Sequence, residues 1–271
     1  MSLEYLATLN AHPRDVNIKF KEHGHVYTVK HAGNPAGDSG FTSVTTLIHS
    51  LFAGFDSDKI VTNMMNSKNW PNSKYFGMTK QEIQKQWSDS GTAAANAGTM
   101  MHADIEAYYN GLSVVNDSLE YMHFQKFVAD FAHLVPYRTE WMIYHEELRL
   151  AGSIDMVFRD PNDNDVLLIY DWKRVAEISK INKFNQWSIS DVFVVPDTKY
   201  WHYALQLNIY KAILIEKYGM HITDLYLVGL HPTNLTYIRI PVCDMQDKVN
   251  SLFLEKLEKM KNKKVYLPSN K

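Results

Sequence analysis

The sequence predicts an α/β protein in which a mixed β-sheet is flanked by helices. Its first half carries long runs with helical periodicity, and its middle carries three consecutive runs rich in β-branched and aromatic residues. A further helical run separates these from two more strand-like runs, which is typical of a sheet with several kinds of connection. The expected strands are residues 139–148, 149–158, 165–173, 224–232 and 235–242.

The first 90 residues are expected to form a flanking, partly mobile wall. Residues 16–30 alternate in polarity around a His-Gly turn, which predicts a β-hairpin. A loop rich in glycine and proline follows, and Ser43 then has the position of the first residue of a short helix that reaches Phe52. Residues 66–78 form a polar loop that contains several aromatic residues.

Three helices are predicted between this wall and the strands. Residues 79–87 begin with Thr and Glu at the spacing of a capping box. A second helix, residues 92–109, is expected to stop before Asn110 and Gly111, which together are a helix-terminating signal. A third helix covers residues 117–133. Two later helices are expected at residues 201–218 and 245–262.

Size and composition fit one folded domain of a soluble enzyme. We expect residues 1–271 to form a single domain, with a flanking region at 1–90, a core at 91–245 and a terminal helical segment at 246–271. The formal net charge of −2 points to no partner by itself, although a local basic groove is compatible with it. Cys243 is the only cysteine, which excludes a disulfide framework and a four-cysteine zinc or iron–sulfur site. No signal-peptide or membrane-spanning pattern is found, so we expect an intracellular protein without a membrane partner.

The segment 152–174, GSIDMVFRDPNDNDVLLIYDWKR, carries the clearest chemical signal. Its middle has part of the spacing of a calcium-binding loop, but Asp165 stands where such a loop needs glycine, and strands rather than helices flank it. The DPNDND run is instead typical of a turn. Asp155 and Asp171 remain unexplained by a turn, because each lies inside an apolar strand, where a lone carboxylate is costly.

Strand geometry brings the unexplained carboxylates together. Asp171 and Lys173 are two residues apart, so they project from one face of their strand, while Trp172 points to the other face. If the two strands pair as a hairpin, Asp155 lies beside Asp171. Adjacent carboxylates repel one another unless a cation lies between them, which favours a divalent ion such as Mg²⁺.

These residues resemble the signature of the PD-(D/E)XK nuclease superfamily, with aspartate in the second acidic position. GTMMHADIEAYYNG (98–111) resembles the histidine helix of its RecB-like branch, and QLNIY (206–210) resembles the Q-x-x-x-Y helix. FTSVTTLIHSLF (41–52) is similar to the Ser-Val-Thr segment of phage, viral and mitochondrial genome maintenance-type exonucleases. The resemblance covers about residues 95–215 and implies a restriction-endonuclease-like core.

The resemblance also implies a role for each matched residue. Asp155 and Asp171 would bind the metal together with His102 and the main-chain carbonyl of Trp172, and Lys173 would be the catalytic lysine. Glu140 would bind a metal-bound water or a second metal; it would equally suit an ion pair at a strand edge. The residues expected at the nucleic acid are Gln206, Tyr210, Ser43 and Arg174, although Gln206 and Tyr210 have the alternative of packing their helix against the sheet.

The expected activity is that of a nuclease dependent on Mg²⁺ or Mn²⁺, with one or two ions and no iron–sulfur cluster. We expect a DNA exonuclease that acts on duplex ends or single strands in recombination, repair or replication. The alternatives are an endonuclease on DNA or RNA and a non-catalytic nucleic-acid-binding protein that kept the fold. Polarity, DNA against RNA and oligomeric state are not determined by the sequence. Candidate strand contacts are Lys59, Lys68, Lys74, Lys80, Lys85, Lys180 and Lys183, interleaved with Trp70, Tyr75, Phe184 and Trp187.

Overall fold

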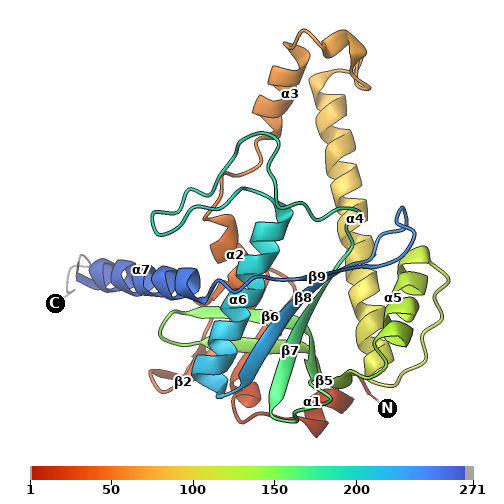
Figure 1. The fold of residues 1–271 in the computed structure, drawn as a ribbon. Helices are drawn as coiled ribbons and strands as arrows, with labels where there is room; N and C mark the ends of the chain where they lie inside the picture. Colours follow the sequence, from red (N-terminus) through yellow and green to blue (C-terminus); the bar gives the residue numbers. More distant parts are fainter. Residues whose placement is uncertain (1, 266–271) are drawn as a thin grey trace.

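A mixed sheet lies at the centre of the molecule, as the sequence predicts (Figure 1). The computed structural model describes residues 2–265, and the side chains of residues 2–262. The order of strands along the sheet is β4, β6, β7, β8 and β9, and β5 pairs with β6. The strands are β4 (Thr42–Ser43), β5 (Val135–His145), β6 (Leu150–Arg159), β7 (Val166–Lys173), β8 (His221–Gly229) and β9 (Ile238–Pro241).

Strand β6 changes its neighbour halfway along one edge. Its other edge pairs with β5 in antiparallel fashion along almost its whole length. On the changing edge, Leu150 and Ala151 pair with β4 in parallel, whereas Met156–Arg159 pair with β7 in antiparallel fashion. Residues 152–155, the Gly-Ser-Ile-Asp stretch, therefore lie where the sheet forks. Strand β7 then pairs in parallel with β8, which makes the sheet mixed.

Helices cover both faces of the sheet (Figure 1). One face packs against α2 (Val44–His49), α6 (Lys199–Tyr218) and α7 (Gln246–Val265). The other face packs against α5 (Leu119–Asp130) and the C-terminal part of α4 (Lys80–Tyr109), around an aromatic cluster that includes the buried ring of Trp172. The orientation expected for Trp172, opposite to that of its neighbours on β7, is confirmed.

The N-terminal region contains more regular structure than the sequence indicates. The predicted hairpin is confirmed as β1 (Ile18–Lys21) and β2 (Val26–His31), but β3 (Asn34–Asp38) adds a third strand where a loop was expected. A short helix, α1 (Tyr5–Leu9), precedes the hairpin. The side chain of Asn110, at the end of α4, accepts a hydrogen bond from the amide of Leu6 and so ties α1 to the core.

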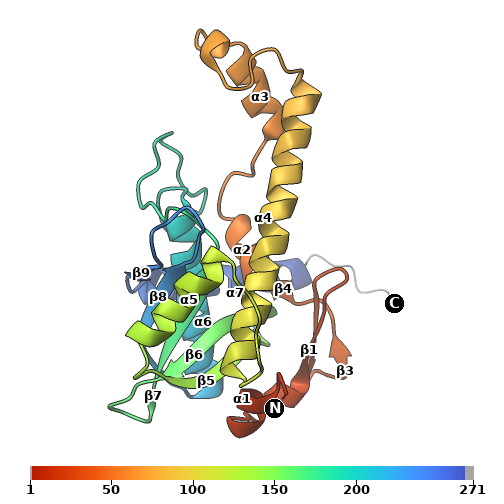
Figure 2. The ribbon, with the colours of Figure 1, turned by 90° about the vertical axis from the view of Figure 1, so that its right-hand side faces the viewer.

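Helix α4 is one continuous helix of 30 residues, and the prediction of two separate helices is wrong. The capping box of Thr79 and Glu82 begins it as expected. The helix continues through Gly91 because a glycine costs only about 1 kcal/mol in a helix interior, and alanines, the strongest helix formers, follow it. With α3 (Ser57–Met65), which the sequence did not reveal, the first half of α4 projects from the body as an arm (Figure 2).

Other predicted elements agree with the structure to within a few residues. Helix α2 begins at its expected cap, since the hydroxyl of Ser43 accepts a hydrogen bond from the amide of Thr46. Strand β5 begins four residues earlier than expected, and α6 two residues earlier. Among the described residues, no helix has both the length and the apolar character to cross a bilayer.

Candidate metal centre

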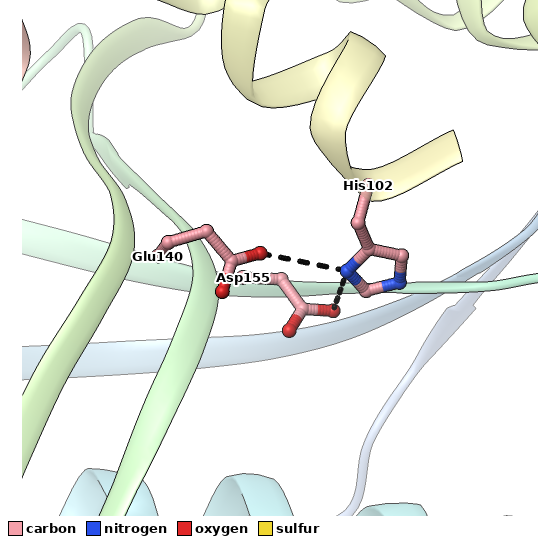
Figure 3. Close-up of side chains that lie close together, drawn as sticks. All are labelled: His102, Glu140 and Asp155. Atoms are coloured by element: carbon pink, nitrogen blue, oxygen red, sulfur yellow. Dashed lines mark ion pairs between the residues drawn. The ribbon is translucent and has the colours of Figure 1, made fainter. Parts of the chain in front are cut away.

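Three side chains from three different elements converge beside the fork in the sheet (Figure 3). The Nδ1 atom of His102, on α4, lies 3.5 Å from Oε1 of Glu140 on β5 and 3.6 Å from Oδ2 of Asp155 on β6. One ligand atom from each residue lies within 4.8 Å of the others. An imidazole and two carboxylates at this spacing are a donor set suited to Mn²⁺ or Mg²⁺, and these three residues could hold the ion.

The backbone of Trp172 orients two of the three side chains. Its amide donates a hydrogen bond of 2.9 Å to Oδ2 of Asp155, just beyond the last paired residues of β6 and β7. Its carbonyl oxygen lies 2.9 Å from Nε2 of His102. When Nε2 donates to this carbonyl, Nδ1 faces the two carboxylates, which is the usual arrangement around a metal-binding histidine.

Glu140 has a strained backbone. Its φ of 40° lies in the left-handed region, in the middle of a strand. Its paired neighbours are Thr139 with Met156 and Trp141 with Ile154, so Glu140 stands opposite Asp155 in the register. The hydroxyl of Ser153 donates a hydrogen bond of 3.1 Å to its carboxylate. Such a conformation costs about 1–3 kcal/mol, and residues that tolerate it cluster at functional sites.

The carboxylates control the charge of His102. Burial acts to lower the pKa of His102, but the negative charges of Asp155 and Glu140 outweigh it and raise the pKa to about 9. In the metal-free protein the imidazole is therefore protonated near neutral pH. A proton on Nδ1 occupies the place that a metal ion would take between the three side chains.

Lys173 and Asp171 form a close ion pair next to this group. The ammonium lies 2.7 Å from Oδ2 of Asp171 and 3.9 Å from Oδ2 of Asp155. Burial works against the charge on Lys173, but the two carboxylates raise its pKa above the ordinary value, so Lys173 stays protonated. Burial raises the pKa of Asp171, and the ammonium of Lys173 opposes that shift.

The three-residue group differs in membership from the set implied by the sequence resemblance. Glu140 joins His102 and Asp155, whereas the almost fully buried Asp171 faces Lys173 and is not one of the three. The carbonyl of Trp172 contacts His102 in this structure. The strand register predicts Asp155 near Asp171. In the structure the closest partner of Asp171 is the ammonium of Lys173, at 2.7 Å, and the same ammonium lies 3.9 Å from Asp155.

Gln206 and Tyr210 support the site from inside the protein. Both side chains are buried on α6, and the amide of Gln206 donates a hydrogen bond of 3.1 Å to the hydroxyl of Tyr210. The ring of Tyr210 lies against Gly152, where a Cβ atom would be 2.6 Å from Cε1 of the ring. The structure therefore favours the packing role over direct contact with a nucleic acid, and it explains why glycine precedes Asp155 by three residues.

The remaining predicted contact residues lie outside the three-residue group. Ser43 uses its hydroxyl to cap α2, and Arg174 pairs with Glu120 on α5 at 2.7 Å. Arg174 also lines a cavity of about 590 Å³ between α4 and the 175–199 segment. Besides Arg174, five titratable side chains and one aromatic ring line this cavity: Lys183, Lys199, His231, Glu177, Asp197 and Phe184. Lys80 pairs with Asp58 and Lys85 with Asp89, which supports α3 and α4 in the arm.

A second cavity opens directly onto the metal-binding group. It has a volume of about 690 Å³ and reaches from His102 and Glu140 to the hairpin of β1 and β2. Sequence analysis missed its wall residues Phe20, Glu22 and Tyr27, because nothing local in the hairpin reveals that it faces α4. Glu106, one helical turn after His102, also lines it, and burial together with the charge of Glu140 raises the pKa of Glu106 to about 6.

A separate group formed by His145, Glu146 and Glu147 also has ligand atoms within 4.8 Å of one another. His145 is buried, with its ring nitrogens 3.1 Å from Glu216 and 3.2 Å from Glu147. Cations already compensate this group, since Lys217 lies 2.6 Å from Glu147 and Arg14 pairs with Glu146. We therefore interpret it as an ion-pair network.

Comparisons with known proteins leave the function open. No family model and no curated protein matches the chain. Among solved structures, the chain is similar to one described as the crystal structure of SSO0001, with a TM-score of 0.31 and 10% sequence identity over 86% of this chain and 88% of that chain. A TM-score this low carries no argument about fold family or function.

Proposed function

We propose that this protein is a nuclease dependent on Mg²⁺ or Mn²⁺ that hydrolyses phosphodiester bonds of DNA, with a restriction-endonuclease-like core. The observation that carries the proposal is the convergence of His102, Glu140 and Asp155 within 4.8 Å, with the ammonium of Lys173 3.9 Å from Asp155. Three ligands and an adjacent cation are the components needed to hydrolyse a phosphate ester. His102, Glu140 and Asp155 would hold the ion.

The chemistry supplied by a bound divalent ion is polarisation of the phosphate and a lower pKa for a bound water. Lys173 keeps its proton and offsets negative charge that develops on the phosphate oxygens. The oxygen of water forms a bond to phosphorus, the bond from phosphorus to the leaving oxygen breaks, and that oxygen takes up a proton. Trp172 holds His102 and Asp155 in place through its main-chain groups during the reaction.

Exonuclease action on ends or single strands is the mode we propose. The cavity at the 175–199 segment supports it, because Arg174, Lys183 and Lys199 offer cations to phosphates and the exposed ring of Phe184 offers a surface for a base, beside the carboxylates of Glu177 and Asp197. The test compares linear and circular single-stranded DNA, each with Mg²⁺, Mn²⁺ or EDTA, and uses labels at both ends. We expect linear DNA alone to be cut, and only with metal.

Lys173→Ala is expected to slow cleavage by about a hundredfold or more. Lys217→Ala is the matched control, because Lys217 is equally buried and also ion-paired but lies in the His145 network. Rapid cutting of circular DNA would assign endonuclease action instead. Metal-dependent binding without any cleavage would favour a nucleic-acid-binding protein, and unchanged cleavage by Lys173→Ala would remove that lysine from the reaction.

A further inference from the structure

The cavity at the 175–199 segment and the cavity at the hairpin differ in the charged side chains that line them. The cavity at the 175–199 segment is lined by the cations of Arg174, Lys183 and Lys199 and by the carboxylates of Glu177 and Asp197. The cavity at the hairpin is lined by the carboxylates of Glu22, Glu106 and Glu140, and none of the described residues that line it is a lysine or an arginine. The first cavity therefore offers cations to the phosphates of a strand, whereas the second, which has no lysine or arginine among its described lining residues, repels a polyanion.

The two cavities lie at successive positions along α4. One is lined by Ala94 of α4, and the other by Gly98, Thr99, His102 and Glu106, further along the same helix. Figure 2 shows the sheet of β1 to β3 on one side of α4 and the segment after β7 on the other. Arg174 lines the first cavity and directly follows Lys173, whose ammonium lies 3.9 Å from Asp155 of the metal-binding group. The acidic cavity borders that group through His102 and Glu140, and a third cavity, which includes Arg138, borders it through Glu140.

The acidic cavity contains a preformed aromatic surface. Phe20 and Tyr27 are directly opposite each other in the β1–β2 ladder, and their rings lie 4.7 Å apart. The ring of His25, at the end of the turn, also contacts the ring of Phe20, with 5.8 Å between the two ring centroids. Phe20 is 37% exposed and lines the cavity together with Tyr27, Met142 and the carboxylates of Glu22 and Glu106. Such a ring is suited to stack with a flat, neutral group.

We propose that the acidic cavity receives the terminal nucleoside of a single strand, with its base stacked on Phe20, while the scissile phosphate lies at His102, Glu140 and Asp155. This inference rests on the proposed nuclease function and adds the reason for action at an end. A base is neutral and planar, whereas a continuing strand would bring further phosphates next to Glu22 and Glu106. The volume of about 690 Å³ suits one or two nucleosides. The products are therefore expected to be mononucleotides or dinucleotides.

The experiment measures base stacking and cleavage separately. The probes are single-stranded oligonucleotides with 2-aminopurine at the 5′ end, the 3′ end or the middle, added to Lys173→Ala protein with Mn²⁺. Stacking quenches 2-aminopurine, so we expect quenching at one end and none in the middle. Phe20→Leu in the same protein is expected to remove the quenching and Phe20→Trp to retain it. Tyr5→Leu, on the exposed face of α1, is the control.

Kinetics of proteins that retain Lys173 provide the second measurement. Removing the terminal base from the substrate is expected to raise KM by about 5- to 150-fold, the range measured for loss of one stacked base. Phe20→Leu is expected to raise the KM for the intact substrate by the same factor. In this variant, removal of the terminal base should not change KM further. Equal KM values for intact and abasic ends, or uniform quenching at all three positions, would overturn the cavity assignment. Absence of any metal-dependent cleavage by wild-type protein would instead overturn the nuclease proposal.

Discussion

Gly152→Ala tests the link between the fork in the sheet and helix α6. The added Cβ would lie 2.6 Å from Cε1, 3.0 Å from the hydroxyl oxygen and 3.2 Å from Cζ of Tyr210. Real Cβ atoms essentially never approach another heavy atom below 3.0 Å. Because Tyr210 is almost fully buried, its ring has no free space to move into, so α6 and β6 have to separate slightly.

We expect Gly152→Ala to lower the free energy of unfolding by about 1–3 kcal/mol, the usual cost of overpacking a core. Urea denaturation followed by tryptophan fluorescence measures it. The same substitution at Gly91, in the exposed part of α4 with no atom within 4 Å of the new Cβ, is the control. There alanine is expected to stabilise the protein by about 0.5–1 kcal/mol.

A double-mutant cycle assigns the cost to the right contact. Tyr210→Leu removes the edge of the ring, so Gly152→Ala should cost at least 1 kcal/mol less in that background than in the wild type. The affinity for Mn²⁺ should fall with Gly152→Ala, because Ser153 and Asp155 follow directly on β6. The steric explanation would be refuted if Gly152→Ala stayed within 0.5 kcal/mol of the wild type, or if its cost were the same with leucine at position 210.

Three further results are expected. Mn²⁺ affinity should rise with pH up to about 9, because the pKa of His102 is raised and its proton has to leave before the metal binds. Calorimetry in buffers of different ionisation enthalpy should show the release of this proton on metal binding. His102→Ala should abolish the proton release. Asp171→Asn should destabilise the protein by about 3 kcal/mol by leaving Lys173 without its closest partner, and adding Lys173→Met should restore most of that loss in thermal unfolding. Thr79→Ala should cost about 1 kcal/mol at the start of α4, seen as faster amide hydrogen exchange over residues 80–83, and an arm with unchanged exchange would contradict the capping role.

The sequence predicts the sheet well because its strands carry strong local signals. β-Branched residues define β6 and β7, and the turn between them is rich in Asp, Asn and Pro, so the hairpin and the positions of Asp155 and Lys173 follow from period and turn chemistry. The arm was missed for the opposite reason. Residues 57–65 are only nine and mix apolar with polar residues, and α3 contacts α4, as in the ion pair between Asp58 and Lys80.

The assembly of the candidate site depends on tertiary structure that no local pattern contains. The left-handed conformation of Glu140 is held by the strands around it. That Glu140 rather than Asp171 joins His102 and Asp155 is evident only in the folded chain. The role of the Trp172 backbone is also hidden, since any residue has the same amide and carbonyl. Phe20 belongs to a hairpin about 80 residues away from His102, and only the folded chain brings it to the same cavity.

The continuity of α4 has a mechanical consequence for the site. About 33 Å of helix separates Lys80 from His102, at 1.5 Å per residue. Met101 and Ile105 are buried against the body and act as a fulcrum immediately beside His102. A displacement of about 3 Å at the far end of the arm tilts such a rod by about 5° and moves His102 by only a few tenths of an ångström. The arm can therefore follow the shape of whatever it touches while the ligand geometry at the fork stays almost fixed.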